Sequence, residues 1–540
     1  MEKFVAAANW LLGPEKSDER HPGHLWPRWI FLRALGLIYF SAFYSFYFQI
    51  RGLIGPDGIL PAGQYLQAVA SAPNLNRFWF APTLLWLGTS DRALMLLCWA
   101  GLVASLLVVI NFWPRASLFV CFVCFLSFIA AAQDFASYQS DGMLLEAGFI
   151  SLFFAPSGFW PGLAAADAPS RLSRFLLQWE WFRIYFESGV VKLASHDQSW
   201  RNLTAMDDYY QNGPLPTWVG YYVQHFPHWF HASTVVLTLA IELFIVWMLF
   251  LPRRFRIACF CIVTPFEISI ISTANYAFLN YLVLSLGFLL LDDRVIEGLL
   301  PQRIRMLVEW PRRANTESPP KRSRELWHRV LRLIGMTVSA IFLGLVFYVA
   351  TVQLVDMLST WAFATETPLP EAPVEWLAPF RIADRYGLFA VMTHERYEIE
   401  FQGSADGKTW TPYLFRYKPQ DVKAAPRIYA PYQPRFEWNL WFASLGSWQQ
   451  YKFVVWTEVR LLQNSPDVLR LFAGNPFPSS PPKLVRAVIY QYWFTDLRTK
   501  REQGTWWRRE LLGEYAPAVE MQPNGEPALL NVPTASPPEP

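Results

Sequence analysis

Long apolar stretches separated by short polar connections fill the chain up to about residue 355. A helix that crosses a membrane needs about 20 mostly apolar residues. We therefore predict a polytopic α-helical membrane bundle with about nine transmembrane helices. They are expected near residues 29–50, 93–112, 116–133, 143–158, 175–193, 233–251, 255–272, 276–291 and 329–353.

Arginines in the short connections predict the orientation of the bundle, because positively charged loops are retained in the cytoplasm. If Arg28 is cytoplasmic, alternation along the predicted helices places all the remaining basic connections on the cytoplasmic side as well. These connections hold Arg115, Arg171, Arg174, Arg253, Arg254, Arg256 and the stretch from Arg303 to Arg324. The longer loops 51–92, 134–142 and 194–232 are then expected outside, with everything after about residue 355.

The same alternation divides the chain into regions. Residues 1–28 lack the pattern of a cleaved signal peptide and are expected to be cytoplasmic. Proline and arginine in residues 301–328 predict a disordered, basic cytoplasmic linker. The predicted regions are the N-terminus 1–28, the multi-helix domain 29–300, the linker 301–328, the last transmembrane helix 329–355, an exported domain 356–517 and a disordered tail 518–540.

The exported domain has the pattern of a β-rich fold. Between Tyr397 and Phe401 apolar and acidic residues alternate, which is the period of a half-buried strand. A turn with glycine and aspartate follows and predicts a hairpin. Further elements are expected as a returning strand at 410–417, a short helix capped by Ser465, and strands at 485–494 and 505–511. Short strands joined by Pro- and Gly-rich turns predict a β-sandwich-like domain.

Composition supports a membrane protein and excludes some other classes. The chain is 53% hydrophobic and 16% charged, whereas soluble domains carry roughly 25% charged residues. Its net charge of +3 is too small and too dispersed for a nucleic-acid partner. All five cysteines lie in apolar segments, so the exported domain has no disulfide framework.

Common catalytic and cofactor signatures are missing from the sequence. We find no nucleophile elbow of a lipase, no phosphate-binding loop, no zinc-protease motif and no dinucleotide fingerprint. His225, His228 and His231 lie close together, but Pro227 interrupts the segment and its aromatic residues are typical of a membrane-surface belt. We therefore predict no metal and no cofactor.

Ionisable residues inside the apolar segments are the main candidates for a functional site, because each costs roughly 2.5–3.5 kcal/mol to insert. Glu180, Arg183 and Glu187 follow helical spacing and form one polar stripe with internal ion pairs. The other candidates are Asp141, Glu146, Lys192, Glu242 and Glu267. Two interpretations stay open: structural ion pairs that order the bundle, or a hydrated functional cavity that faces outward.

The outer loop from His196 to Pro216 follows Lys192 directly and is rich in aromatic residues. Such a composition predicts an ordered loop that roofs any cavity between the polar helices. Its candidate site residues are Trp200, Arg201 and Asp207, and Arg201 is expected to pair with Asp207 or Asp208 at the rim.

Several long motifs follow one another along most of the chain. They are Phe31-Leu-Arg-Ala34, Leu53 to Pro61, Ser188 to Leu193, Ser199 to Ala205, Gly213 to Pro216, His228 to His231, Asp384 to Phe389, Ile399 to Gly403, Gly474 to Phe477 and Trp506 to Arg508. Together these motifs closely resemble the lipase maturation factor family.

The resemblance implies a membrane protein that helps an exported client, such as a lipase or another hydrolase, to fold or assemble. We expect a bacterial inner-membrane protein with its C-terminal domain in the periplasm, or an endoplasmic-reticulum protein if the source is eukaryotic. Membrane lipids are the other expected partners. Candidate client contacts are the aromatic residues Trp438, Trp441 and Phe442, and the alternative for these residues is a packed core.

A second, weaker resemblance covers only the membrane part. The segment from Tyr185 to Leu193, with Trp200, is similar to vitamin K-dependent γ-carboxylase and its bacterial transmembrane relatives. It implies an alternative function as a membrane enzyme that acts on a lipid or quinone-like substrate, with Lys192 as the base. Whether the chain is an enzyme stays open at this point.

Overall fold

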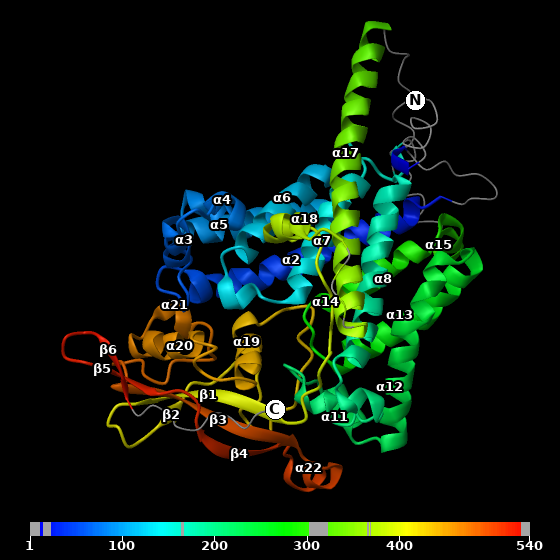
Figure 1. The fold of residues 1–540 in the computed structure, drawn as a ribbon. Helices are drawn as coiled ribbons and strands as arrows, with labels where there is room; N and C mark the ends of the chain where they lie inside the picture. Colours follow the sequence, from blue (N-terminus) through cyan, green and yellow to red (C-terminus); the bar gives the residue numbers. More distant parts are fainter. Residues whose placement is uncertain are drawn as a thin grey trace.

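A small sheet lies at one end of the molecule; short helices separate it from part of the helical bundle, and other helices of the bundle reach down beside it (Figure 1). The computed structural model describes residues 11–13, 23–163, 167–301, 322–363, 365, 367 and 369–530.

Each predicted transmembrane segment overlaps a helix. These helices are α2 (Leu25–Ile54), α5 (Asp91–Val109), α6 (Pro114–Ile129), α7 (Gln139–Phe154), α8 (Arg171–Ala194), α12 (His228–Leu243) with η4 (Ile245–Phe250), α13 (Arg253–Thr273), α14 (Leu279–Gly287) with η5 (Phe288–Leu290), and α17 (Arg322–Met357) with η7 (Leu358–Ala362). By length and composition, five spans in the described part can cross a membrane: Leu25–Ile54, Asp91–Val109, His228–Phe250, Arg253–Thr273 and Leu333–Thr360. The chain is thus a membrane protein with several apolar helices, and the count of nine crossings stays a prediction.

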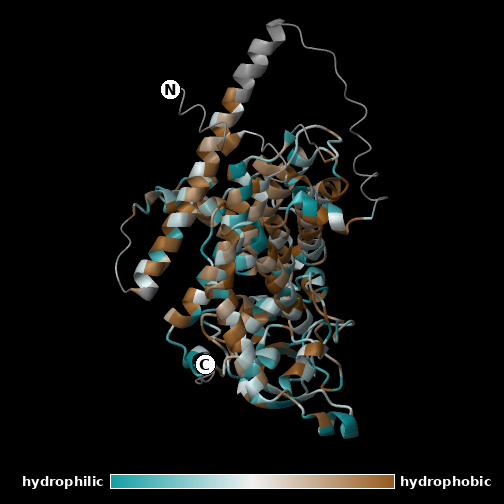
Figure 2. Cartoon of the chain, turned by 90° about the vertical axis from the view of Figure 1, so that its right-hand side faces the viewer, coloured by the Kyte–Doolittle hydropathy of each residue, from teal (hydrophilic) through white to brown (hydrophobic). Residues whose placement is uncertain are grey.

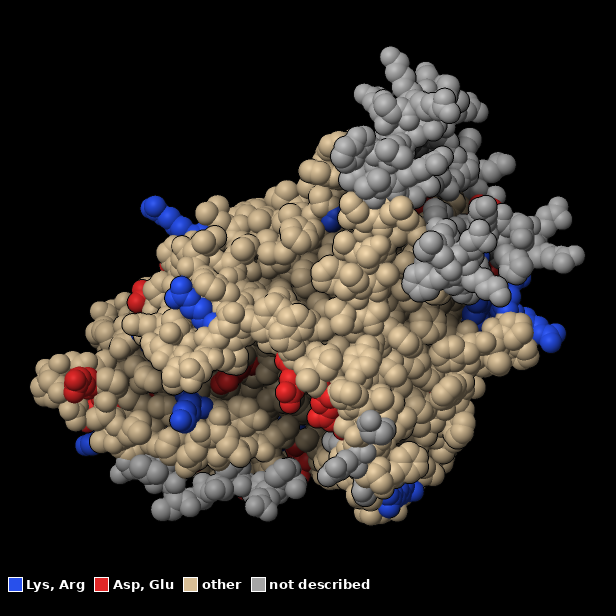
Figure 3. Space-filling view, turned by 45° about the horizontal axis from the view of Figure 1, so that its top comes forward, with Lys and Arg blue, Asp and Glu red and all other residues tan. Residues whose placement is uncertain are grey.

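Apolar side chains cover the outside of this bundle. Leu237, Trp247, Ile268 and Ile341 are large apolar residues that remain exposed on α12, η4, α13 and α17. In Figure 2 the helices are largely brown, and Figure 3 shows a face that is mostly free of charge. A surface of this kind fits a hydrocarbon environment, in which helices satisfy their own backbone hydrogen bonds.

Small residues allow the first helices to pack closely. A Cβ atom at Gly101 of α5 would lie 2.4 Å from the ring of Phe43 on α2. A Cβ atom at Gly36 of α2 would lie 2.9 Å from Val109. Close approach at small residues is the usual way in which membrane helices associate.

Short helices occupy the connections. They are α3 (Ala62–Ser71), α4 (Arg77–Phe80), η1 (Leu84–Leu87), η2 (Gln133–Ala136), α9 (Gln198–Arg201), α10 (Tyr209–Asn212), α11 (Trp218–Gln224), α15 (Asp293–Leu299), α18 (Ala372–Leu377) and η8 (Ala378–Phe380). Trp200, Tyr209, Tyr210 and Leu215 are buried, so the expectation of an ordered, packed loop over 196–216 is confirmed.

The C-terminal domain holds one antiparallel sheet. Its strands are β1 (Arg396–Ser404), β2 (Thr411–Pro412), β3 (Leu484–Phe494), β4 (Trp507–Glu514), β5 (Ala518–Met521) and β6 (Pro527–Leu530). The order is β2-β1-β3-β5-β6, and β4 also pairs with β3. In the central pair, Phe401 lies opposite Ala487. The strand predicted at 485–494 is therefore present, and the one predicted at 505–511 is shifted toward the C-terminus.

The predicted returning strand at 410–417 is wrong beyond its first residues. The backbone N–H groups of Arg416, Tyr417 and Lys418 donate to the carboxylate of Glu437 at 2.6–2.9 Å. These groups are thus not available to a ladder with β1, and the strand ends at Pro412.

Helices stand where a second sheet was expected, so the β-sandwich-like prediction is wrong for the described residues. They are α19 (Arg435–Ser444), α20 (Phe453–Leu462), α21 (Pro466–Leu469) and α22 (Leu497–Gln503). Helix α19 packs on β1 and α20 packs on β3. The predicted short helix is present as α21, but the side chain of Ser465 makes no cap hydrogen bond to it. The Ser465 hydroxyl donates to Asp57 O at 2.9 Å instead.

Two predicted boundaries also change. Residues 518–530 form the hairpin β5–β6, with Val519 buried opposite Val485, so the tail prediction is wrong for them. Residues 531–540 lie outside the described residues. In the predicted linker, residues 322–328 belong to α17, and 302–321 lie outside the described residues.

Glu458 of α20 is a buried carboxyl group that forms no ion pair with any residue that the structure describes. Burial raises the pKa of this group well above its usual value. Folding therefore favours the protonated form, and the contribution of Glu458 to stability is full below the unfolded pKa of about 4.3 and is lost as the pH rises toward the folded pKa.

We expect Glu458→Met to raise the free energy of unfolding at pH 8 by about 1–3 kcal/mol, because an unpaired polar group is removed from the core. The gain should shrink toward pH 5. Thermal unfolding of both proteins from pH 5 to 8 measures the difference, and Glu502→Met on the exposed helix α22 is the control. A gain that does not depend on pH would contradict the raised pKa.

Candidate functional site

Residues 383–396 connect the end of η8 to β1 and lie along α8; we call this segment the strap. Its backbone binds side chains of α8 one after another. Arg183 donates to Asp384 O at 2.7 Å, and Tyr386 N donates to Glu187 at 2.7 Å. Further along, Leu388 N donates to Ser188 at 3.3 Å. The strap thus fixes the start of the C-terminal domain to a membrane helix.

The second half of the strap binds the outer loop. The indole of Trp200 donates to Phe389 O at 3.1 Å, and Met392 N donates to Asp197 at 2.7 Å. Arg396, at the start of β1, is buried and donates to the carbonyls of Gln211 and Gly213. The loop predicted to roof a cavity therefore also holds the C-terminal domain.

A buried ionic network lies beneath the strap. Arg183 pairs with Glu146 of α7 and lies 3.7 Å from Glu187 one turn further along α8. Glu146 also accepts from Asp384 N at 2.9 Å and from the hydroxyl of Tyr386 at 2.6 Å. Burial raises the pKa of the Asp384 carboxyl to about 6. The polar stripe is thus largely a set of structural pairs.

Glu180, the third member of the predicted stripe, is buried and forms no ion pair within the described part of the chain. The expected ion pair within the stripe therefore forms only between Arg183 and Glu187.

A second buried ion pair joins the two parts of the chain. Arg435 of α19 donates to both oxygens of Asp141 on α7, at 2.6 and 2.7 Å, and to Phe135 O at 2.9 Å. Its guanidinium lies 4.2 Å from the ring centre of Phe46. Both charged side chains are fully buried. Asp141 is thus bound to the C-terminal domain and does not belong to a cavity.

A cavity of about 240 Å³ lies between α8, α12, α13 and α14, under the outer loop. At its polar end Lys192 pairs with Glu242 at 2.8 Å. Nearby, Glu267 accepts from the hydroxyl of Tyr185 and from Asn280 at 2.8 Å. Its apolar wall includes Met206, Val223, Phe230, Leu237, Phe266 and Ile270.

The surroundings of Lys192 bear on its proposed role as a base. Besides Glu242, the ammonium donates to Leu388 O at 3.1 Å and to Ser188 O at 3.4 Å, and it lies 5.2 Å from the ring centre of Trp200. All three protons have acceptors. A base needs a free lone pair directed at its substrate, so this geometry fits a structural cation.

The predicted rim pair is wrong. Arg201 is exposed, and its guanidinium lies 3.2 Å from both Leu193 O and His196. It faces the carbonyl end of α8, which favours a cation. Asp207 instead lies 3.0 Å from His228. Arg201 and Asp207 are therefore outside the cavity and do not act together.

The three neighbouring histidines do not converge. His225 bonds to Tyr221 O and Thr495 O, and His228 bonds to Asp207. Within the described ranges there is no group of three or more His, Cys, Asp or Glu side chains that could hold a metal ion.

The predicted client contacts lie at the interface between the two parts. Trp438 is buried, with its ring centre 4.8 Å from that of Tyr138, and Phe442 lies 5.8 Å from the same ring. Trp441 is half-buried against Phe442. The prediction that Trp438 is a free client contact is therefore wrong, because α19 packs this side chain against the membrane part.

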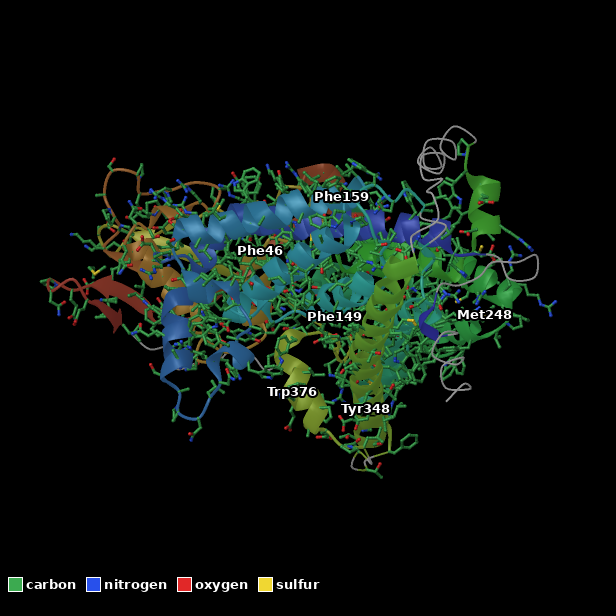
Figure 4. The ribbon with its side chains drawn as sticks, turned by 90° about the horizontal axis from the view of Figure 1, so that it is seen from above. Phe46, Phe149, Phe159, Met248, Tyr348 and Trp376 are labelled. Carbon is green, nitrogen blue, oxygen red and sulfur yellow. The ribbon has the colours of Figure 1, made fainter. Side chains whose placement is uncertain are left out.

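Exposed aromatic residues gather elsewhere. Trp79 of α4 stacks on Trp376 of α18 with ring centres 4.4 Å apart, and its indole donates to Trp376 O at 2.7 Å. Trp376 stays 55% exposed. Figure 4 shows it on a helix that projects beside α17. A cleft of about 640 Å³, which we call the aromatic cleft, is lined by Leu75, Asn76, Trp79, Phe80, Ala372, Glu375, Trp376 and Pro379.

The sequence singled out many of these positions but not their partners. The strap contains the motif Asp384 to Phe389, whose contacts with α8 span about 200 residues of sequence. The sequence did not identify Arg435 as a buried partner of Asp141, since an arginine in a polar segment is usually exposed.

Two family models match this chain. The Lipase maturation factor transmembrane domain matches residues 26–298, and the Lipase maturation factor C-terminal domain matches residues 382–517, which begins at the strap. No solved structure matches the chain.

Curated relatives match over nearly the whole chain. Lipase maturation factor 2 of Gallus gallus is 32% identical over 93% of this chain and 82% of its own length. Lipase maturation factor 2 of Homo sapiens is 31% identical over 93% of this chain and 83% of its own length. Lipase maturation factor 1 of Bos taurus is 29% identical over 93% of this chain and 90% of its own length. The family models cover residues 26–298 and 382–517, and these relatives match over 93% of the chain, so the chain belongs to the lipase maturation factor family.

Proposed function

We propose that this chain is a membrane-bound maturation factor that assists an exported hydrolase, of the lipase class, to fold or assemble without catalysing a reaction. The observation that carries the proposal is the match to relatives named lipase maturation factor over 93% of the chain, in both domains. The C-terminal domain, held on the membrane part by the strap and by Arg435, is suited to present one rigid surface to a client.

The geometry does not favour the alternative of a membrane enzyme. That function requires Lys192 as a base, and its ammonium is occupied by Glu242 and two carbonyls. The cavity beside Lys192 is therefore not assigned to catalysis.

We further propose that the C-terminal domain faces the exported side of a bacterial inner membrane. The aromatic cleft combines a loop and a segment that the charge pattern places on that side. Exposed aromatic residues grouped in a cleft are typical of interaction sites. The occupant that we assign to it is an apolar, incompletely folded segment of the client.

A tagged chain, cross-linked in its native membrane, tests the function. We expect an exported hydrolase to co-purify, and we expect deletion of the gene to lower the activity per molecule of that hydrolase. If nothing exported is captured, and every secreted hydrolase keeps its full specific activity after deletion, the proposal fails.

Trp376→Ala tests the aromatic cleft. We expect it to lower the affinity for the cross-linked client at least about thirtyfold, because a large aromatic anchor commonly contributes about 2 kcal/mol or more to binding. Trp160→Ala removes an indole that is 60% exposed and does not line the cleft, and it is the matched control. Equal capture by both variants would remove the cleft from client binding.

A further inference from the structure

The cavity beside Lys192 opens toward the lipid-facing surface of the bundle. Leu237 of α12 lines it and is still 49% exposed, and Ser269 of α13, also exposed, lines it from the other side. An opening between two apolar helices admits molecules from the bilayer. The apolar wall suits a hydrocarbon chain.

One polar atom in this cavity has no partner. Glu242 lines the cavity and is buried, and its Oε1 binds Lys192, but its Oε2 accepts no hydrogen bond. A buried carboxylate oxygen without a donor costs free energy. The site therefore lacks a hydrogen-bond donor.

The serine and threonine hydroxyls of α12 and α13 that line the cavity do not supply this donor. Thr234 and Thr238 of α12 donate to carbonyls of their own helix at 2.7 and 2.8 Å. Ser269 and Thr273 of α13 do the same at 2.6 and 2.8 Å. Glu267 is already bound by Tyr185 and Asn280.

The charged groups around Glu242 determine which kind of hydrogen-bond donor can bind there. A second ammonium at Glu242 would lie close to that of Lys192, and like charges repel strongly in a medium of low dielectric. An anionic phosphate would face the carboxylates of Glu242 and Glu267. A neutral hydroxyl avoids both conflicts.

We propose that this cavity binds the polar end of a neutral lipid alcohol, such as a monoacylglycerol. Its hydroxyl donates to Glu242 Oε2, and its acyl chain leaves between α12 and α13 into the bilayer. The cavity of about 240 Å³ holds the polar end and the first part of the chain. The site is independent of the client, and no bond is made or broken.

Photolabelling tests the site. The full chain is placed in phosphatidylcholine nanodiscs with a monoacylglycerol that carries a diazirine in its acyl chain, and labelled peptides are identified by mass spectrometry. We expect labels on α12 and α13. Leu237→Trp should lower labelling at least fivefold by filling the mouth, whereas Val236→Trp, on the adjacent exposed residue outside the cavity, should leave it within twofold.

Competition with unlabelled lipids tests the hydroxyl on the unmodified protein, so it decides the proposal even if a variant fails to fold. The monoacylglycerol should compete at least tenfold better than the methyl ester of the same fatty acid. Equal competition, equal labelling of the two variants, or labels away from α12 and α13 would overturn the proposal. None of these readouts involves a client, so they stand apart from the proposed maturation function.

Discussion

Replacing Arg183 with methionine is expected to lower the free energy of unfolding by at least about 3–5 kcal/mol, the usual cost of removing one partner of a buried ion pair. The change leaves the carboxylates of Glu146 and Glu187 buried, and it also removes the donor to Asp384 O. Thermal unfolding in detergent measures the loss. Limited proteolysis should show faster cleavage within the strap.

Two further variants make the Arg183 prediction specific. Arg201→Met removes an exposed arginine close by and should change stability by less than about 0.5 kcal/mol. Combining Arg183→Met with Glu146→Gln and Glu187→Gln removes the uncompensated charges and should regain at least half of the lost stability. If the single Arg183 variant unfolds like the parent, the network does not hold the strap.

Arg435→Met should also cost about 3–5 kcal/mol, because Asp141 then lies buried in the bundle without a counter-charge. The double variant Asp141→Leu with Arg435→Met lacks both charges, and its free energy of unfolding should be close to that of the parent. A double-mutant cycle on the unfolding free energies measures the coupling.

Arg498→Met on α22 is the control, since its guanidinium is largely exposed. Simple addition of the two single effects would show that Asp141 and Arg435 do not act as a pair. Faster proteolysis of the whole C-terminal domain in Arg435→Met would show that the pair holds the domain in place.

The sequence predicted the helices well because their signal is local. Each apolar stretch can be recognised without knowing its neighbours, and each predicted segment overlaps a helix. The long strand β3 was predicted for the same reason, since Val485 to Phe494 carries its own β pattern. The short length of β2 was missed, because it depends on the distant carboxylate of Glu437.

The polar positions were predicted from their cost of burial, and their partners were not. Glu146, Glu187 and Lys192 stood out within apolar helices, and the structure places all three against the strap. Their contacts join residues about 200 positions apart, which no spacing rule predicts. The sandwich prediction was wrong because helices α19 and α20 pack on β1 and β3, where a second sheet would have to lie.

The order of synthesis gives the strap a consequence for assembly. Asp141, Glu146 and Glu187 are made well before the residues that bind them, which are Arg435, Asp384 and Tyr386. Until the C-terminal domain has been synthesised, Asp141 is without the arginine that binds it. Glu146 and Glu187 already have Arg183 of the bundle, but not the hydrogen-bond donors of the strap. A chain that ends before Arg435 thus keeps the Asp141 carboxylate inside the bundle without its counter-charge, so full-length molecules are more stable than truncated ones.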